Sequence, residues 1–494
     1  MRRVASGFSP PIVIDPTSGK SLHSQIYDAY RTAILKHKLQ PGQQVPSTRV
    51  LALELGISRI PVLNAYAQLQ AEGYFESPTR GGTFICRRLP EQLTGCEPPH
   101  LRRNSIGSGE RNVSRRSALM PSFHLAPWIQ ERGAFCVGQV AADTFPSKVW
   151  SSLVTRHCRD MSTRSLNFSS PMGLERFRKV IAEYVRAVRG VNCDERQILV
   201  VSGSQQALEL SAHVLLDAGD SVWFEEPGYW LARRAFALAG CQIVPVPVDN
   251  EGLEINAGIR QCREARLAYV TPSHQFPLGT TMSVARRMQL LDWAQSSGSW
   301  IIEDDYDSEY RYEGTLIPSL QGLDANSRVI YVGTFSKILF PSLRVGYLVV
   351  PPDLVDRFVA TRIAMDMYPP QLYQAVLADF IGDGHLARHT RRMRLIYGEK
   401  REILVDALES EFGSSLEILG EEAGMHLVAA IPPTLNDREI AMNAARQNLW
   451  LWPLSPMYQG KSPRQGFILG FGSAPANEIL PAVRRLPAFL RAVA

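Results

Sequence analysis

The sequence predicts a multidomain chain in which a small, mostly helical domain precedes a larger α/β domain that ends in a small α+β lobe. Length is the first observation, because 494 residues are too many for one ordinary domain of about 100–200 residues. Charge is the second: residues 1–120 carry 16 Lys and Arg against 8 Asp and Glu, whereas the remainder carries 37 against 40. Pattern is the third, since helical periodicity at the front gives way to apolar runs that alternate with amphipathic stretches. The basic front segment indicates an anionic partner for that segment alone.

Composition excludes several classes of protein. Hydrophobic residues make up 45% of the chain and charged residues 20%, which is globular usage and excludes a disordered or collagen-like chain. We see no run of about 18 apolar residues, so we expect no membrane span, and Pro10, Pro11 and Pro16 leave no apolar run for a signal peptide. The seven cysteines are scattered and never spaced as Cys-x-x-Cys, so we expect neither a disulfide framework nor a metal site. We expect a soluble, cytoplasmic protein.

Three helices and a hairpin are expected in the front domain, residues 15–86. Apolar residues recur at helical spacing until Pro41-Gly42 ends the first run. Ser47 and Ser58 are suitable N-caps for the second and third helices. The expected bounds are helices over 22–34, over 48–55 and from 58 onward, with hairpin strands at Phe75 and Thr83–Ile85. This order of elements predicts a winged helix-turn-helix.

The DNA contacts follow from that geometry. In a winged helix-turn-helix the second helix of the pair enters the major groove, where its first residues reach base edges. Here these are Ser58 and Arg59, with Asn64 one turn on; arginine suits guanine and asparagine suits adenine. Arg49 at the start of the preceding helix and Arg80 at the hairpin tip are expected to contact phosphate or the minor groove.

The front domain resembles the GntR-type DNA-binding domain, and the resemblance covers about 65 residues. It departs from the family at Pro61, where a threonine whose hydroxyl can contact phosphate is usual, so the resemblance does not extend to that one contact with the DNA backbone. The resemblance implies double-stranded operator or promoter DNA as the partner. The matching runs are 22–27, 39–42, 45–49, 55–59, 71–74 and 82–85.

Residues 87–121 predict a flexible linker, because they are rich in Pro, Gly, Ser and Arg and show no helical or strand period. Residues 122–494 then form the α/β domain, whose part from about 375 onward is expected to be the small lobe. The expected strands of the large part are 198–202, 221–225, 267–271, 300–303, 328–332 and 346–350. The expected elements of the lobe are a helix over 385–408 and strands near 427–431 and 467–470.

A lysine in an unusual setting follows one of these strands. Lys337 comes directly after Ser336, and Arg344 lies seven residues further on. A lysine amine at a strand end, beside hydroxyls and an arginine, can form a Schiff base next to a bound phosphate. Asp304 and Tyr306 follow another apolar strand. Pyridoxal 5′-phosphate (PLP) needs a carboxylate beside its ring nitrogen, so we expect Asp304 to contact that nitrogen and Tyr306 the ring oxygen.

Two further pieces lie upstream. Ser204 and Gln205 begin a helix directly after a strand, where backbone N–H groups can hold a phosphate. Tyr229 follows the next strand and has an aromatic ring that can stack on a cofactor.

These pieces in this order resemble the large domain of fold type I PLP enzymes, the aminotransferase superfamily. With the front domain and the linker, the arrangement resembles the MocR/GabR family of GntR-type transcriptional regulators over nearly the whole chain. By that resemblance Lys337 carries PLP as a Schiff base, and Ser204, Gln205, Ser336 and Arg344 hold its phosphate. It also implies a domain-swapped homodimer, in which the DNA-binding domain of one chain lies over the cofactor domain of the other.

Two positions depart from a working aminotransferase, and a third departs from a sensing member of the regulator family. Phe276 stands where these enzymes usually have asparagine, and Ile468 stands where they carry the arginine that binds the substrate carboxylate. Leu231 stands where the GABA-sensing member of the family has a further arginine. Loss of such a clamp removes charge-assisted hydrogen bonds of about 1.5–3 kcal/mol each. Arg464 is the candidate substitute.

We therefore expect a PLP-dependent transcriptional regulator whose aminotransferase-like domain is a sensor rather than an enzyme. The leading expectation is that it senses PLP itself and controls vitamin B6 supply, with an amine or amino acid as the alternative effector. Two other hypotheses are a catalytically active aminotransferase with an accessory DNA-binding domain, and a large domain that serves only as a dimerisation scaffold.

Overall fold

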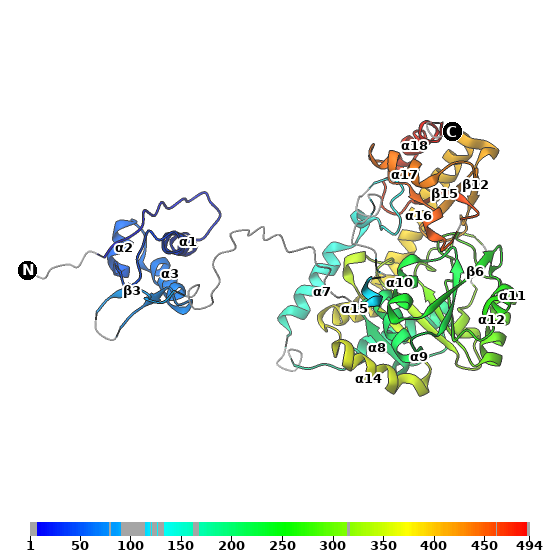
Figure 1. Cartoon of the computed structure of the whole chain (residues 1–494), viewed down its shortest axis with the longest axis horizontal. Helices are drawn as coiled ribbons and strands as arrows, with labels where there is room; N and C mark the ends of the chain where they lie inside the picture. The colour runs from blue at the N-terminus through cyan, green and yellow to red at the C-terminus, as the bar shows by residue number, and fades with distance from the viewer. Residues whose placement is uncertain are drawn as a thin grey trace, which may run out of the picture. The chain divides into compact units, whose positions relative to one another are not determined.

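The computed structural model describes residues 7–78, 81–89, 114–118, 120, 126, 133–161, 167–313, 317–460 and 462–491. The chain divides into two compact units, one on each side of residue 112 (Figure 1). The fold has the predicted class, because a mostly helical front unit precedes an α/β unit. Among the described residues, we find no helix that is both long and apolar enough to span a bilayer.

The front unit packs three helices on a small antiparallel sheet of order β1-β3-β2. Its core contains the rings of Tyr30, Tyr66 and Phe75, which meet edge to face with centroids 5.0–5.7 Å apart. Ser47 accepts a hydrogen bond of 3.3 Å from the Val50 N–H, which confirms it as an N-cap worth about 1 kcal/mol. The bounds are α1 (Leu22–Leu35), β1 (Gln44–Val45), α2 (Thr48–Glu54), α3 (Arg59–Ala71), β2 (Phe75–Glu76) and β3 (Thr83–Ile85).

The large unit is built on an eight-stranded sheet of order β4-β11-β10-β9-β8-β5-β6-β7. Strands β10, β9, β8, β5 and β6 are parallel to their neighbours in that run, while β11 and β7 are antiparallel to theirs. The bounds are β4 (Ile198–Val201), β5 (Ser221–Glu226), β6 (Gln242–Asp249), β7 (Gly252–Leu253), β8 (Leu267–Val270), β9 (Trp300–Asp305), β10 (Val329–Thr334) and β11 (Gly346–Val349).

Helices cover both faces of this sheet, because each strand alternates its apolar side chains between two cores. Ile302 on β9, for example, packs on one face with α9, α10 and α14, and Ile301 packs on the other with α11 and α12. Helices α7, α8 and α15 complete the second face. The bounds are α7 (Ser147–Arg159), α8 (Glu175–Arg189), α9 (Ser204–Leu215), α10 (Trp230–Ala239), α11 (Ile255–Cys262), α12 (Val284–Ser297), α13 (Leu320–Leu323), α14 (Val355–Asp366) and α15 (Leu372–Gly382).

The small lobe packs helices on a four-stranded antiparallel sheet of order β12-β13-β15-β14 (orange to red in Figure 1). Its core also takes in Phe135 and Val140, which precede the large sheet in the chain. The predicted start near 375 falls inside α15, which packs on α7 and α8, so the lobe begins with α16. The bounds are α16 (His385–Phe412), β12 (Glu417–Leu419), β13 (His426–Ile431), α17 (Asp437–Ala445), β14 (Trp452–Pro453), β15 (Gln465–Gly470), α18 (Ala476–Val483) and α19 (Leu486–Arg491).

The predicted linker, residues 87–121, lies for the most part outside the described residues. Its described part contains a short helix, α5 (Arg115–Ala118), which contacts α10. The expectation of a linker without regular structure is therefore wrong at this point, because a contact with the folded domain stabilises a turn that has no periodicity of its own.

Candidate functional site

A cavity of about 240 Å³ lies where the parallel strands of the large sheet end. The segments that follow β4, β5, β8, β9 and β10 all contribute to it, and open α/β sheets bind ligands at this edge. The structure brings seven of the eight predicted cofactor residues to this cavity: Ser204, Tyr229, Asp304, Tyr306, Ser336, Lys337 and Arg344.

Lys337 follows β10 and projects its amine into the cavity. Nζ donates a hydrogen bond of 2.9 Å to the carbonyl of Gly138. Desolvation lowers the pKa of Lys337, although the carboxylates of Asp307 and Asp304 oppose the shift by favouring the charged form. The amine is therefore neutral, and nucleophilic, in a larger fraction of molecules than that of an exposed lysine.

Asp304 at the end of β9 has one free carboxylate oxygen. Oδ2 accepts a hydrogen bond of 2.8 Å from the Tyr269 hydroxyl, whereas Oδ1 is buried and has no partner among the described residues. Burial raises the pKa of Asp304 to about 7, against the effect of the Tyr269 hydrogen bond. An unpartnered buried acceptor at the cavity fits a ligand that presents an N–H, such as the protonated ring nitrogen of PLP.

The opposite end of the cavity suits a phosphate group. Helix α9 begins there at Ser204. Its N-cap is Gly203, which has no side chain that could accept a bond from the first N–H groups of the helix. The free N–H groups and the positive end of the helix dipole attract anions. The Arg344 guanidinium lies against Gly203, and the buried Oγ of Ser336 has no partner among the described residues. These residues fit the phosphate of PLP.

Gln205 is the predicted residue whose side chain does not line the cavity. Its amide nitrogen donates a hydrogen bond of 3.2 Å to the carbonyl of Leu231. Since Gln205 occupies the first turn of α9, its backbone N–H remains at the phosphate end.

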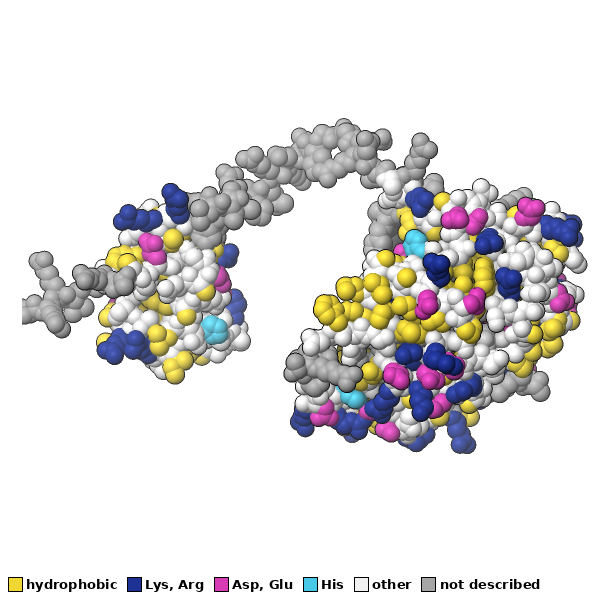
Figure 2. Space-filling view, turned by 90° about the horizontal axis from the view of Figure 1, so that it is seen from below, with side chains coloured by type: hydrophobic (Ala, Val, Ile, Leu, Met, Phe, Trp, Pro, Cys, Tyr) yellow, Lys and Arg dark blue, Asp and Glu magenta, His cyan; other side chains and the backbone are white. Residues whose placement is uncertain are grey.

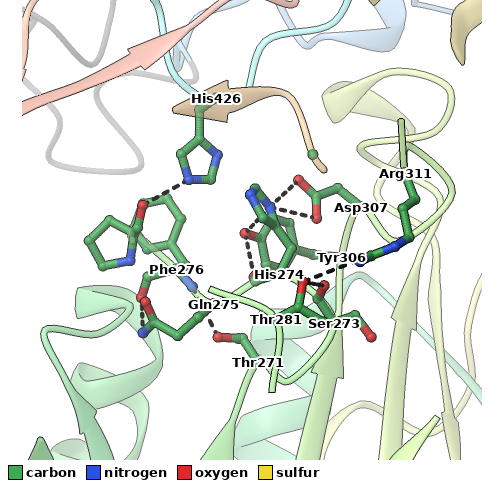
Figure 3. Close-up of polar contacts among 12 residues, drawn as sticks. Thr271, Ser273, His274, Gln275, Phe276, Thr281, Tyr306, Asp307, Arg311 and His426 are labelled. Atoms are coloured by element: carbon green, nitrogen blue, oxygen red, sulfur yellow. Dashed lines mark hydrogen bonds and ion pairs between the residues drawn. The ribbon is translucent and has the colours of Figure 1, made fainter. Parts of the chain in front are cut away.

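Tyr306 lies in a polar network at the cavity wall (Figure 3). Its hydroxyl donates to the carbonyl of His274 over 2.9 Å and lies 3.1 Å from Nδ1 of the same residue. Asp307 accepts from that nitrogen, with its two oxygens at 3.1 and 3.2 Å. Burial and nearby carboxylates raise the pKa of Tyr306 well above its usual value, so the phenol stays protonated. Its oxygen can still accept a bond from a ligand.

His426 lies across from this network, and its ring centroid is 4.7 Å from that of His274. Potential metal-binding atoms of His274, Asp307 and His426 all lie within 4.8 Å of one another, a grouping that the sequence did not predict. Nδ1 of His274 already contacts Asp307, and Nε2 of His426 donates to the Pro277 carbonyl over 3.1 Å. We therefore interpret the cluster as the support of Tyr306.

The remaining wall is apolar. Phe276 lines the cavity, with its ring centroid 5.5 Å from that of Tyr229 and 6.4 Å from that of Trp452. Ile468, which stands where aminotransferases carry an arginine, is fully buried behind this wall and pairs with Trp452 across β14 and β15. Arg464, the candidate substitute, lines a separate pocket beside Asp249.

Sequence reasoning missed several residues of the cavity. Asp307 carries a usable signal, because it belongs to the same acidic run after β9 as Asp304. Gly138, His426 and Trp452 carry none, since each is far from Lys337 in the chain and reaches the cavity through the tertiary fold.

The predicted DNA-contacting residues belong to the front unit, and the face of this unit drawn in Figure 2 shows more basic than acidic side chains. Arg49 on α2 and Ser58, Arg59 and Asn64 at the start of α3 are all exposed. Nε of Arg59 donates a hydrogen bond of 3.0 Å to the Thr48 hydroxyl, which orients the guanidinium. Ser58 occupies the N-cap position but makes no capping bond, so that part of its prediction is wrong and its hydroxyl is free for DNA. Arg80 lies outside the described residues.

Comparison with known proteins gives two family matches. Residues 22–85 match the family described as "Bacterial regulatory proteins, gntR family", and residues 134–456 match "Aminotransferase class I and II". The chain is 40% identical to the "Probable rhizopine catabolism regulatory protein MocR" of Rhizobium meliloti over 461 residues, 93% of this chain and 92% of that protein. It is 30% identical to the "HTH-type pyridoxine biosynthesis transcriptional regulator PdxR" of Corynebacterium glutamicum, over 94% of each chain.

Among solved structures, the chain is similar to a kynurenine aminotransferase of Pyrococcus horikoshii in complex with PMP. The TM-score is 0.72 at 25% identity, and the match covers 78% of this chain and 98% of that one. The cavity residues and this likeness together establish PLP as the cofactor of the large domain. The chain therefore belongs to the MocR-type GntR family of transcriptional regulators, in which a helix-turn-helix DNA-binding domain is joined to an aminotransferase-like PLP domain.

Proposed function

We propose that this regulator senses PLP through the cavity of its large domain and adjusts its binding to operator DNA accordingly. The observation that carries the proposal is the division of the cavity. The cofactor end keeps Lys337, Asp304 and the Arg344–Gly203 corner, while the end where an amino acid substrate would lie is apolar. A site that holds the cofactor without gripping a substrate suits a sensor of the cofactor.

In this proposal each group of cavity residues binds a different part of PLP. Lys337 supplies a largely desolvated amine for attachment, and the unpartnered Oδ1 of Asp304 would accept a hydrogen bond from the protonated ring nitrogen. Ser336, Arg344 and the first turn of α9, including Ser204 and the backbone of Gln205, bind the phosphate. When bound, PLP supplies an electron-withdrawing ring, which this chain would use as a recognition element. Tyr229 would contact that ring, and Tyr306, held by His274, would offer its phenol oxygen to it.

Ser58, Arg59 and Asn64 would reach base edges, and Arg49 and Arg80 would contact phosphate or the minor groove. The assembly we propose is a domain-swapped homodimer in the cytoplasm. The regulated genes would concern vitamin B6 supply, a proposal supported by the 30% identity to a protein described as a pyridoxine biosynthesis regulator. Ligand binding that favours one arrangement of the two DNA-binding domains would shift the population toward it.

A catalytic aminotransferase is the second candidate, and the retained Asp304 and Lys337 favour it. Ile468, Phe276 and Leu231 weigh against it, because none can bind a carboxylate. Rapid conversion of an amino acid to its 2-oxo acid, abolished in Lys337→Ala, would establish that activity.

The test is binding of the purified protein to DNA upstream of its own gene, titrated with PLP at fixed salt, because phosphate contacts make the affinity depend steeply on salt. We expect PLP to change the affinity or the footprint of the parent protein and to leave Lys337→Ala unaffected. Lys179→Ala, which changes an exposed lysine on α8, is the matched control and should respond like the parent. Unchanged DNA binding with PLP in the parent protein would refute PLP as the signal.

A further inference from the structure

We infer that the part of the cavity beyond the cofactor groups binds an amine with an aromatic or aliphatic body and no carboxylate. This inference rests on the proposed function, because it names the effector class of the same sensor cavity. It selects the amine over the amino acid as the second ligand of the protein.

The wall of this part of the cavity is apolar through two layers. The first layer holds the aromatic rings of Phe276 and Trp452, and the Phe276 centroid lies 5.3 Å from that of His426. Ile468 and Leu454 pack directly behind it and are fully buried. The other apolar residues of the first layer are Val137, Trp230, Leu231 and Met425. A surface of this kind favours a hydrophobic ligand body through area removed from water.

The cations that line the cavity, within the described part of the chain, lie at the cofactor end. Arg344 contacts Gly203 at the start of α9, and Lys337 contacts Gly138. His426 offers no positive charge, because burial lowers its pKa well below the usual value and its Nε2 donates to a carbonyl.

The two arginines of α10 are also directed elsewhere. Arg233 donates a hydrogen bond of 2.8 Å to the carbonyl of Met457. Arg234 lies over the Trp230 ring, 4.5 Å from its centroid, and neither arginine lines the cavity. A ligand carboxylate would thus be desolvated without a partner, which is costly.

A carboxylate at the cavity favours a cationic ligand over an anionic one. Asp307 lines the cavity and contacts His274 through both of its oxygens. Its charge lies beside Lys337, where it attracts a cationic amine and repels a carboxylate. Charge and wall chemistry therefore agree on the ligand class.

The experiment uses the PLP-loaded full-length protein and pairs of probes that differ only in the carboxylate: phenethylamine against phenylalanine, and tryptamine against tryptophan. Binding is measured by calorimetry, with the quenching of tryptophan fluorescence as a second readout for the phenyl pair, because Trp230 and Trp452 line the cavity. We expect each amine to bind at least about tenfold more tightly than its amino acid, from the charge-assisted bonds that the carboxylate lacks. The parent protein alone gives this comparison, so it does not depend on the folding of a variant.

Two variants and one control variant extend the test. Trp452→Ala should weaken amine binding about tenfold or more and leave PLP loading, followed by visible absorbance, unchanged, whereas Tyr373→Ala, on the exposed face of α15, should change neither. Ile468→Arg is designed to supply the missing clamp and should shift the preference toward the amino acid.

Equal or tighter binding of the amino acids would overturn the inference, since it would mean that a carboxylate clamp exists in the assembled protein. Absence of binding by any amine, with DNA binding still responsive to PLP, would also overturn it and would leave the proposed function standing. Failure of the PLP response of DNA binding would instead refute the proposed function, whatever the amines do.

Discussion

The guanidinium of Arg344 lies directly over Gly203, so close that a Cβ added to the glycine would come within 3.0 Å of it. Gly203 has a φ of 101°, which side chains rarely adopt, and it is the N-cap of α9. The missing side chain thus lets an arginine and a helix N-terminus share one small anion-binding corner.

Gly203→Ala should therefore weaken the binding of PLP about tenfold or more, while the affinity for pyridoxal, which has no phosphate, should change little. Gly298→Ala is the matched control, because Gly298 also has a positive φ, of 69°, but has no atom within 4 Å of an added Cβ. Fluorescence titration of both ligands checks the prediction. An equal loss of affinity for PLP and pyridoxal would show that the corner does not bind phosphate.

Asp304→Asn should stabilise the cofactor-free protein at alkaline pH. The carboxyl has a pKa of about 7 in the folded protein against 3.8 ordinarily, so the folded state holds a proton that the unfolded state has lost. Stability therefore falls as pH rises through this window, and the asparagine avoids the loss. We expect its melting temperature to exceed that of the parent by roughly 2–5 °C at pH 8 and to match it near pH 4. Asp292→Asn, on the exposed side of α12, should show no such trend. Saturation with PLP should reverse the order at pH 8.

Asp307→Asn should shift the pH dependence of PLP capture. Of the charges around Lys337, Asp307 does most to favour the ammonium form, so its removal lowers the pKa of Lys337 further. The capture rate, followed by absorbance, should reach its plateau about 0.5–1 pH unit lower than in the parent. Asp383→Asn, at an exposed position between α15 and α16, is the control. A shift toward higher pH would contradict this account of the amine.

Substitution of Arg59 and of Arg49 in the DNA-binding unit should change DNA binding in different ways. Arg59→Ala should cost about 1–3 kcal/mol on the operator and reduce discrimination between bases, because Thr48 orients this side chain at the start of α3. Arg49→Ala should weaken binding to all sequences alike and lower the salt slope by about one. Fluorescence anisotropy at several salt concentrations separates the two. Arg196→Ala, an exposed change on the large unit, should affect neither quantity.

Local signals in the sequence were enough to predict most of the framework. Six strands of the large sheet and the three helices of the front unit follow from periodicity and capping residues, as with Ser47 before α2. Strand β6 was not among the predicted strands, and it contains Pro245 and Pro247, which are unfavourable inside a strand. The structure tolerates them because β6 lies near the sheet edge, where β7 pairs only with Val248 and Asp249.

Some residues of the cavity could be predicted from the sequence and others could not. Lys337, Asp304 and Arg344 were predictable because each follows a recognisable strand or motif in the chain. Gly138 and Trp452 were not, since tertiary packing alone brings them to the cavity. The hydrogen bond from the Gln205 side chain to the Leu231 carbonyl likewise depends on tertiary packing, which the local sequence does not encode.

Helix α10 connects the cavity with the short helix α5. Trp230 and Leu231 in its first turn line the cavity, and its last residues contact α5, where Arg116 approaches Gly240. The ten residues of this helix span about 15 Å. Because a helix of this length is stiff, a shift of its first turn would also move its last turn. Because α5 lies close to the start of the large unit in the sequence, helix α10 runs from the cavity toward the part of the large unit that precedes it in the chain. A spin label at Ser117, which is exposed on α5, would therefore report the occupancy of a cavity that it never touches.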